Sequence, residues 1–166
     1  LFPNMGTPGS PAFNSVDAPL WFIWAVQQYY LAGEKDAWRR YGKYVKDILN
    51  AYTAGTSYGI GMHDNGLIFA ASPGKALSWM DAITSDGPVT PRAGYNVEIN
   101  ALWYNALCFA LEMFDSKEDS ELIKKYSPLP EKVRDSFIDL FWLEETKYLA
   151  DYVDRDGDRN IFVRPN

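Results

Sequence analysis

The stretch that most constrains the fold covers residues 97–111 and reads VEINALWYNALCFAL. After Glu98 it carries no charged residue. A helix that is apolar on nearly every side is buried on nearly every side, so this stretch predicts a core helix. Glu98 falls in the first turn, and Asn105 lies two turns further along the same stripe. The helix therefore presents polar groups at the end where the preceding loop enters it.

That preceding loop holds two further elements, LSWMDA at residues 77–82 and VTPRAGYN at residues 89–96. They bring Trp79, Asp81 and Arg92 toward the entrance of the helix. Because the C–H face of a sugar ring suits a flat aromatic surface, an acid beside an indole at a polar helix entrance is typical of a sugar site. The loop and the helix together predict a carbohydrate-binding pocket.

Uncharged and amphipathic helices alternate along the rest of the chain. Residues 18–33 carry no charge, whereas residues 34–54 and 131–142 place apolar side chains on one stripe and charged ones opposite. This alternation indicates an all-α fold in which an inner helical layer is covered by an outer one. We expect helices near 17–33, 35–54, 97–114 and 131–142, with a short one over 121–126.

The connecting segments carry turn signals. Asn65-Gly66 between short apolar runs predicts a β-hairpin over residues 58–71. Residues 1–15, with Pro3, Pro8, Pro11, Gly6 and Gly9, are expected to form a loop. Residues 148–164 are expected to form a short strand, a turn and an extended tail.

Composition limits the possible partners and cofactors. The net charge of −6 and the absence of a dense Lys/Arg cluster argue against nucleic acid, and no apolar run is long enough to span a membrane. The single cysteine, Cys108, fits a reducing compartment. With His63 as the only histidine we expect no metal site, and we interpret the Asp-rich segment 154–160 as a polar turn because it lacks the glycine and glutamate spacing of a calcium loop.

Several segments in order resemble the C-terminal amylo-α-1,6-glucosidase domain of glycogen debranching enzymes. They are NSVDAPLWF at 14–22, the Trp-Met-Asp element at 79–81, Thr-Pro-Arg at 90–92 followed by VEINALWYNAL at 97–107, and IFVRPN at 161–166. These matches are spread over the whole chain. The sequence departs from the family pattern at Ala76, where a Gln is expected, and over residues 83–88.

The resemblance implies an (α/α)6 barrel with a small β-hairpin insertion. Six helical pairs need about twice the length of this chain. We therefore expect residues 1–166 to be a partial barrel, incomplete at the C-terminus and at the N-terminus, that the rest of the same polypeptide or another copy completes. In the family the general base lies near the C-terminal end of the domain, so we expect it beyond Asn166 and expect the fragment alone to be inactive.

The implied activity is cytoplasmic removal of α-1,6-linked glucose stubs from glycogen or a similar limit-dextrin-type α-glucan, by inversion and without a cofactor. Inverting hydrolysis needs one carboxylic acid to protonate the leaving oxygen and one carboxylate to activate water, about 6.5–9.5 Å apart. The resemblance points to Asp81 as the general acid, and an apolar neighbourhood beside Trp79 favours the protonated form that this role requires. A turn or helix-capping role is the alternative for Asp81.

The candidates for substrate binding surround that acid: Asp17, Trp79, Arg92, Glu98, Trp103 and Asn105. Each has a structural alternative. Asp17 also suits an N-cap, and Glu98 also suits a first helical turn. Arg92 suits either a sugar oxygen or a salt bridge to Glu98 or Asp81, and core packing is the favoured interpretation for Trp103.

Two other functions remain open. One is an inverting hydrolase on the same barrel that acts on a different α-glucoside. The other is a non-catalytic glucan-binding or scaffold fragment, since the expected base is not among these residues.

Overall fold

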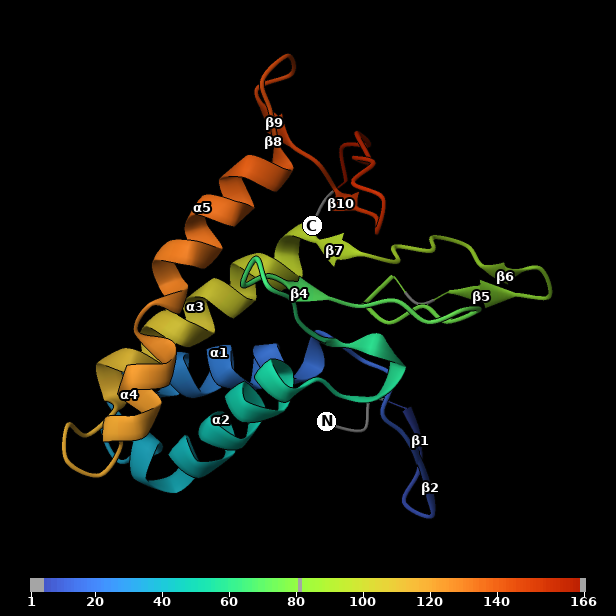
Figure 1. The fold of residues 1–166 in the computed structure, drawn as a ribbon. Coiled ribbons are helices and arrows are strands. Elements are labelled where there is room, and N and C mark those ends of the chain that lie inside the picture. The colour runs from blue at the N-terminus through green and yellow to red at the C-terminus, as the bar shows by residue number, and fades with distance from the viewer. Residues whose placement is uncertain (1–4, 81, 165–166) are drawn as a thin grey trace.

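The computed structural model describes residues 5–80 and 82–164 (Figure 1). Its helices within these residues are α1 (Ala18–Leu31), α2 (Ala37–Ala54), η1 (Ser57–Gly59, a 3-10 turn), α3 (Val97–Met113), α4 (Ser120–Tyr126) and α5 (Leu129–Phe141). The predicted helices are confirmed to within a few residues. Helix α5 begins two residues earlier than expected because Pro130 fits the first helical turn rather than preceding it.

Short antiparallel strands form two-stranded sheets between the helices. The pairs are β1–β2 (Met5–Thr7 with Ser10–Ala12), β3–β4 (Gly61–Met62 with Ile68–Phe69), β5–β6 (Ile83–Thr84 with Gly87–Pro88), β7–β10 (Tyr95–Asn96 with Tyr152–Val153) and β8–β9 (Trp142–Leu143 with Tyr148–Leu149). The all-α expectation is therefore corrected to a helical frame with small sheets. The reason is that connections rich in Gly and Pro satisfy their backbone groups by pairing with each other.

The hairpins outside the helices bear on two further expectations. The hairpin around Asn65-Gly66 is confirmed, and it is shorter than predicted, with Gly66 at φ 83°. The loop expected over residues 1–15 is wrong in part, because Met5–Thr7 pairs with Ser10–Ala12.

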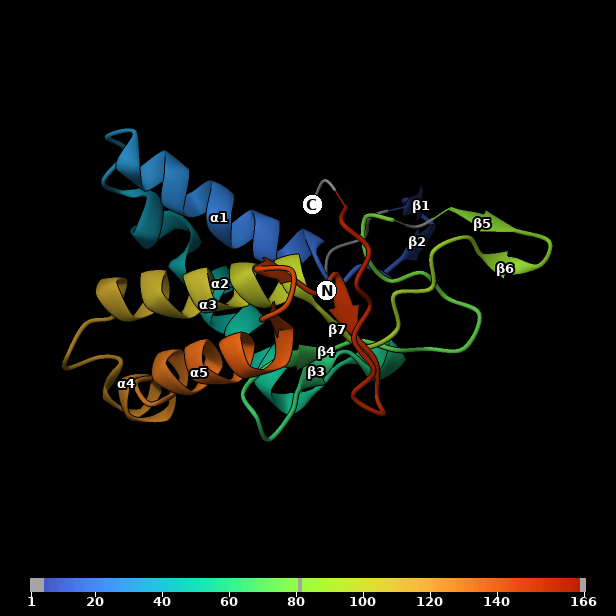
Figure 2. The ribbon, with the colours of Figure 1, turned by 90° about the horizontal axis from the view of Figure 1, so that it is seen from above.

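The helices pack as neighbours around α3. It contacts α1 on one side and α5 on another, and α2 packs against α1. Figures 1 and 2 show that α1 and α3 begin at the same end of this helical frame, where β3, β4, β7 and β10 also gather. Several segments that are distant in sequence therefore come together near the N-terminal ends of α1 and α3.

The uncharged helix α1 is buried on one side only, which agrees with the expectation that an incomplete set of helices leaves apolar surface exposed. Only Pro19, Leu20, Ile23 and Val26 are buried. The rest of the helix exposes large apolar side chains, among them Trp21 (46 % exposed) and Trp24 (42 % exposed). The physical reason is that α2 and α3 pack against one side of α1 and leave the other uncovered.

The backbone entering α3 is held by two neighbouring segments. Gly94 forms a β-bridge with Ala70, and the next two residues, β7, pair with β10. The φ of Gly94 is +147°, and a Cβ at this position would lie 2.1 Å from the carbonyl oxygen of Val153. Only glycine allows β10 to approach this closely.

A buried amide fixes the start of α3 to the hairpin. Asn100 is fully buried. Its Oδ1 accepts a hydrogen bond from the backbone N–H of Ile68 at 2.7 Å, and its Nδ2 donates one to the carbonyl oxygen of Ile68 at 3.1 Å. Its side chain thus pairs with β4 as another strand would. These contacts set the position of the first turn of α3, which carries Glu98.

Candidate functional site

A cleft of about 670 Å³ lies at the junction of α1, α3 and the loop that follows β4. It is lined by Trp21, Trp24, Trp79, Glu98, Ala101, Leu102 and Asn105. The three tryptophans are 42–48 % exposed, so their rings are available for stacking. Trp21 and Trp24 meet edge to face, with ring centroids 5.7 Å apart and planes at 84°. The cleft thus combines aromatic walls with a polar floor on α3.

The polar floor comes from residues on one stripe of α3. Glu98 is in the first turn, with a side chain 14 % exposed. Asn105 lies further along the helix, and its amide nitrogen donates to Gln27 Oε1 of α1 at 2.7 Å. This bond ties α1 to α3 along the cleft and orients the Asn105 carboxamide. Glu98, Asn105 and Trp79 therefore line one cleft, and their contact with sugar stays a prediction.

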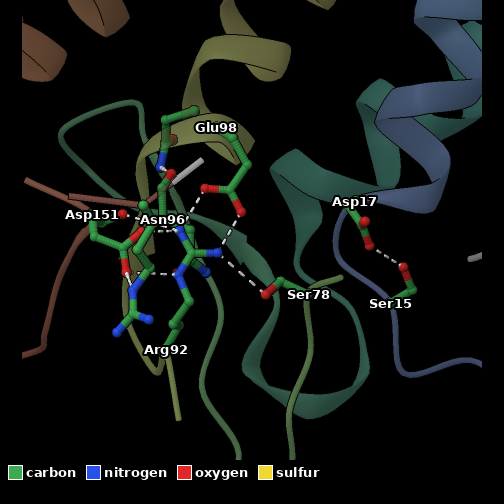
Figure 3. A network of polar contacts seen from close by, with 9 residues as sticks. Ser15, Asp17, Ser78, Arg92, Asn96, Glu98 and Asp151 are labelled. Atoms are coloured by element: carbon green, nitrogen blue, oxygen red, sulfur yellow. Dashed lines mark hydrogen bonds and ion pairs between the residues drawn. The ribbon is translucent and has the colours of Figure 1, made fainter. Parts of the chain in front are cut away.

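Arg92 holds the Glu98 carboxylate in place. Its Nη1 and Nη2 donate to the two oxygens of Glu98, both at 2.6 Å. Its other edge binds Asp151, with Nε to Oδ2 at 3.2 Å and Nη2 to Oδ1 at 3.0 Å. Figure 3 shows the guanidinium between the two carboxylates, with Ser78 Oγ as a further contact at 3.4 Å.

The electrostatics of Arg92 follow from these contacts. Its side chain is 1 % exposed. Burial alone would lower the pKa of Arg92, but the hydrogen bonds and charges of Glu98 and Asp151 outweigh burial and raise that pKa. Because the N–H groups of Arg92 are occupied by protein acceptors, its geometry is that of a salt bridge to Glu98, one of the two alternatives that the sequence left open.

Asp17 lies at the start of α1, and Figure 3 shows it paired with Ser15 and separate from the Arg92 network. It is 9 % exposed and accepts a hydrogen bond from the hydroxyl of Ser15, which itself accepts from the backbone N–H of Ala18. Burial, and then the nearby carboxylate of Asp17, raise the pKa of Tyr52, so this phenol stays protonated and donates to Val16 O at 2.6 Å. Asp17 is held firmly, and its contact with sugar stays a prediction.

Trp103 lies in the core rather than in the cleft. It is fully buried, and its indole N–H donates to Gly66 O at 3.0 Å. Its ring packs against Tyr52 at a centroid distance of 5.9 Å. The structure therefore separates Trp103 from the other candidates, in agreement with the core-packing alternative.

Asp81, the predicted general acid, lies outside the described residues. The residues directly before it are described: Ser78 contacts Arg92, and Trp79 lines the cleft. The carbonyl oxygen of Leu77 also accepts a hydrogen bond from the backbone N–H of Val16 at 2.7 Å, which joins this loop to the segment before α1. The role of Asp81 stays a prediction.

Sequence reasoning missed several residues of this site. Trp21 and Trp24 are three positions apart on an uncharged helix, a spacing that places both on one face, but the sequence does not show which face its neighbours leave uncovered. Asp151 has no sequence signal, because it is an isolated acid between two short strands. Together with Glu98 and Arg164 it also lines a smaller cavity of about 320 Å³.

Among the described residues, no group of three or more His, Cys, Asp or Glu side chains is arranged to hold a metal ion. The segment 154–160 forms a turn in which Asp154 Oδ1 accepts from the backbone N–H groups of Asp156 and Asp158, both at 2.9 Å. In the described ranges, no helix combines the length and the apolar character needed to cross a membrane.

Comparison with known proteins gives one family. Searches among curated proteins and among solved structures returned no match. The family model described as amylo-alpha-1,6-glucosidase matches residues 1–166, the whole of this sequence. The aromatic cleft with its carboxylate and carboxamide floor suits the carbohydrate substrate of such a family. The chain therefore belongs to the amylo-alpha-1,6-glucosidase family, whose members are glycosidases of the glycogen-debranching type.

Proposed function

We propose that this chain takes part in glycogen debranching by hydrolysing α-1,6-linked glucose stubs. Membership of the amylo-alpha-1,6-glucosidase family supports the reaction class. The observation that carries the proposal is the cleft in which Trp21, Trp24 and Trp79 face Glu98 and Asn105. The substrate is a neutral glucan of the glycogen or limit-dextrin type, which the net charge of −6 does not repel.

The cleft offers the two kinds of contact that a glucose unit requires. Indole faces stack on the C–H face of the ring and exclude water from it. The Glu98 carboxylate and the Asn105 carbonyl oxygen accept hydrogen bonds from hydroxyl groups. Because Arg92 and Gln27 hold these two groups, little side-chain entropy is lost when the sugar binds.

For the chemical step we assign the general acid to Asp81. It donates a proton to the glycosidic oxygen as the C1–O bond breaks, and a carboxylate base takes a proton from the water that attacks C1 from the opposite face. Glu98 is assigned to binding rather than to this base, because both of its oxygens accept from Arg92. We place the base beyond Asn166, and the reaction requires no cofactor.

We also propose that the helices form part of an (α/α)6 barrel completed by other helices of the same polypeptide or of another copy. The support is the packing of α1 against both α2 and α3, and the exposed aromatic side chains on the face of α1 that these helices leave uncovered. On this proposal a preparation of residues 1–166 alone self-associates and releases no glucose from a limit dextrin. A monodisperse and active preparation would contradict it.

The test of the function uses Asp81→Asn in the intact enzyme, with a glycogen limit dextrin as substrate. General acid catalysis contributes on the order of 10² or more, so the rate of glucose release is expected to fall by about that factor while the fold is kept. Asp86→Asn, in the exposed turn of the β5–β6 hairpin, is the matched control and keeps its rate.

The stereochemistry and the linkage are read in the same assay. Proton NMR during the first minutes should show β-glucose before mutarotation, as inversion at an α-linkage requires. Preferred release from a substrate without α-1,6 branches would instead support a different α-glucoside hydrolase. Binding without any glucose release by the intact enzyme would support a glucan-binding protein.

A further inference from the structure

Asp151 is the most deeply placed charge in the network around the cleft. Its side chain is fully buried, and it is 59 positions from Arg92 in sequence. The connection between β9 and β10 carries it to the entrance of α3, where its carbonyl oxygen accepts from Val97 N at 3.2 Å. The backbone of Asp151 is therefore fixed to the first residue of the helix that carries Glu98.

The side chain of Asp151 meets two guanidinium groups. Oδ1 and Oδ2 accept from the Nη2–Nε edge of Arg92, and Oδ2 also accepts from Arg164 Nε at 2.8 Å. Glu98 occupies the other edge of Arg92. The four side chains thus alternate in charge, in the order Glu98, Arg92, Asp151, Arg164, and their formal charges cancel.

Because the Arg92 guanidinium is rigid and planar, the position of the Asp151 carboxylate determines the position of the Glu98 carboxylate. Two forked pairs of hydrogen bonds, one on each of two edges, fix both the location and the plane of the Arg92 group. If the Asp151 fork is lost, Arg92 is held only by Glu98, Ser78 and the Asp151 carbonyl oxygen at 3.1 Å. Glu98 then loses the rigid partner that directs its carboxylate at the edge of the cleft.

We infer that Asp151 is a positioning residue for the sugar site, acting on Glu98 through Arg92, although it does not line the tryptophan cleft itself. This inference rests on the proposed function, because it takes Glu98 as a sugar-binding group. It goes beyond that function in assigning a role to a segment between β9 and β10 whose residues are far from α3 in sequence.

The experiment is a double-mutant cycle on the intact enzyme, with maltose as the probe and tryptophan fluorescence as the readout. The variants are Asp151→Asn, Glu98→Gln and the pair together. We expect Asp151→Asn to weaken maltose affinity about tenfold, the effect of roughly one misplaced charged hydrogen bond. In the E98Q background the same change should weaken it less than twofold. That coupling is the signature that a merely structural residue does not give.

Asp119→Asn is the matched control for burial and charge. Asp119 is 6 % exposed and binds Lys46 at 2.5 Å, at the start of α4. This variant is expected to lower the melting temperature while maltose affinity stays within twofold of the unmodified chain. A fall in affinity for Asp119→Asn that matches that of Asp151→Asn would show a general effect of stability and would overturn the inference.

Asp151→Glu keeps the negative charge that both arginines require, and it serves if Asp151→Asn does not fold. The extra methylene displaces Arg92, so we expect about threefold weaker maltose binding with the native Glu98 and no change in the E98Q background. Equal losses in both backgrounds, or no loss, would overturn the positioning role while leaving the proposed function standing. Absence of maltose binding by the unmodified chain would instead count against the proposed function.

Discussion

Arg92 donates to both carboxylate oxygens of Glu98, at 2.6 Å each, across six positions of sequence. The pair joins the loop before β7 to the first turn of α3. It places the charge of Glu98 beside the three tryptophans and leaves no free edge on the arginine. The sugar-binding and structural interpretations of these two residues are thus compatible: in the proposed function Glu98 contacts the sugar, and Arg92 holds the Glu98 carboxylate in position.

Replacing Arg92 by lysine tests that division. Lysine keeps the charge and loses the planar fork, so buried acceptors on Asp151 and Glu98 lose partners. We expect the free energy of unfolding, measured in urea, to fall by about 2–4 kcal/mol. Arg39→Lys is the control, because the Arg39–Asp36 pair has an arginine side chain 82 % exposed, and its stability should not change.

Glu98→Gln should weaken maltose binding more than it weakens the fold. The amide removes the negative charge that accepts from sugar hydroxyls, and we expect about tenfold lower affinity by calorimetry. The loss of stability is limited because Arg92 keeps Asp151 as a counter-charge. Glu112→Gln, an exposed position on the same helix, is the control. Unchanged affinity with a large fall in melting temperature would show that Glu98 is only structural.

Two tryptophans should respond in opposite ways to replacement by alanine. Trp21→Ala removes an exposed wall of the cleft, so maltose affinity should fall about threefold to tenfold with little change in stability. Trp103→Ala leaves a cavity in the core and should cost about 3–5 kcal/mol of unfolding free energy. If Trp21→Ala bound maltose normally, the cleft would not be the sugar site.

Gly94→Ala should disturb both fold and site. The added Cβ would lie 2.1 Å from Val153 O, so β10 must move away from β7. We expect a loss of more than about 3 kcal/mol in unfolding free energy, together with weaker maltose binding. Gly157→Ala is the matched control, since Gly157 also has a positive φ of +91° but nothing within 4 Å of its Cβ position, and only a small loss is expected there.

The sequence was sufficient for the helices and for part of the site. Uncharged stretches and amphipathic patterns predicted α1, α2, α3 and α5, because the buried side chains of a helix recur with the period of its turns. The sequence also predicted that Trp79 lies near Glu98, because Trp79 is in the loop that leads into the helix of Glu98. These are local relationships, which a sequence displays directly.

What the sequence did not show depends on contacts between distant segments. The sequence did not show which face of α1 is uncovered, because an apolar helix looks the same whether its neighbours lie on one side or on all sides. The proximity of Asp151 to Arg92 could not be predicted from the sequence, because it depends on the pairing of β10 with β7. The pairs β1–β2 and β5–β6 were missed for a similar reason, since ladders of two or three residues leave no period to detect.

The pairing of Arg92 with Asp151 across 59 positions has a consequence for how the protein reaches its working form. Closing a flexible loop of that length costs chain entropy of about 4 kcal/mol by the logarithmic rule. That cost falls only when α4 and α5, which lie between the two residues, are already packed. We therefore predict that the Arg92–Asp151 pair forms late in folding, and that loosening α5 against α3 would release Glu98 without altering any residue that lines the cleft.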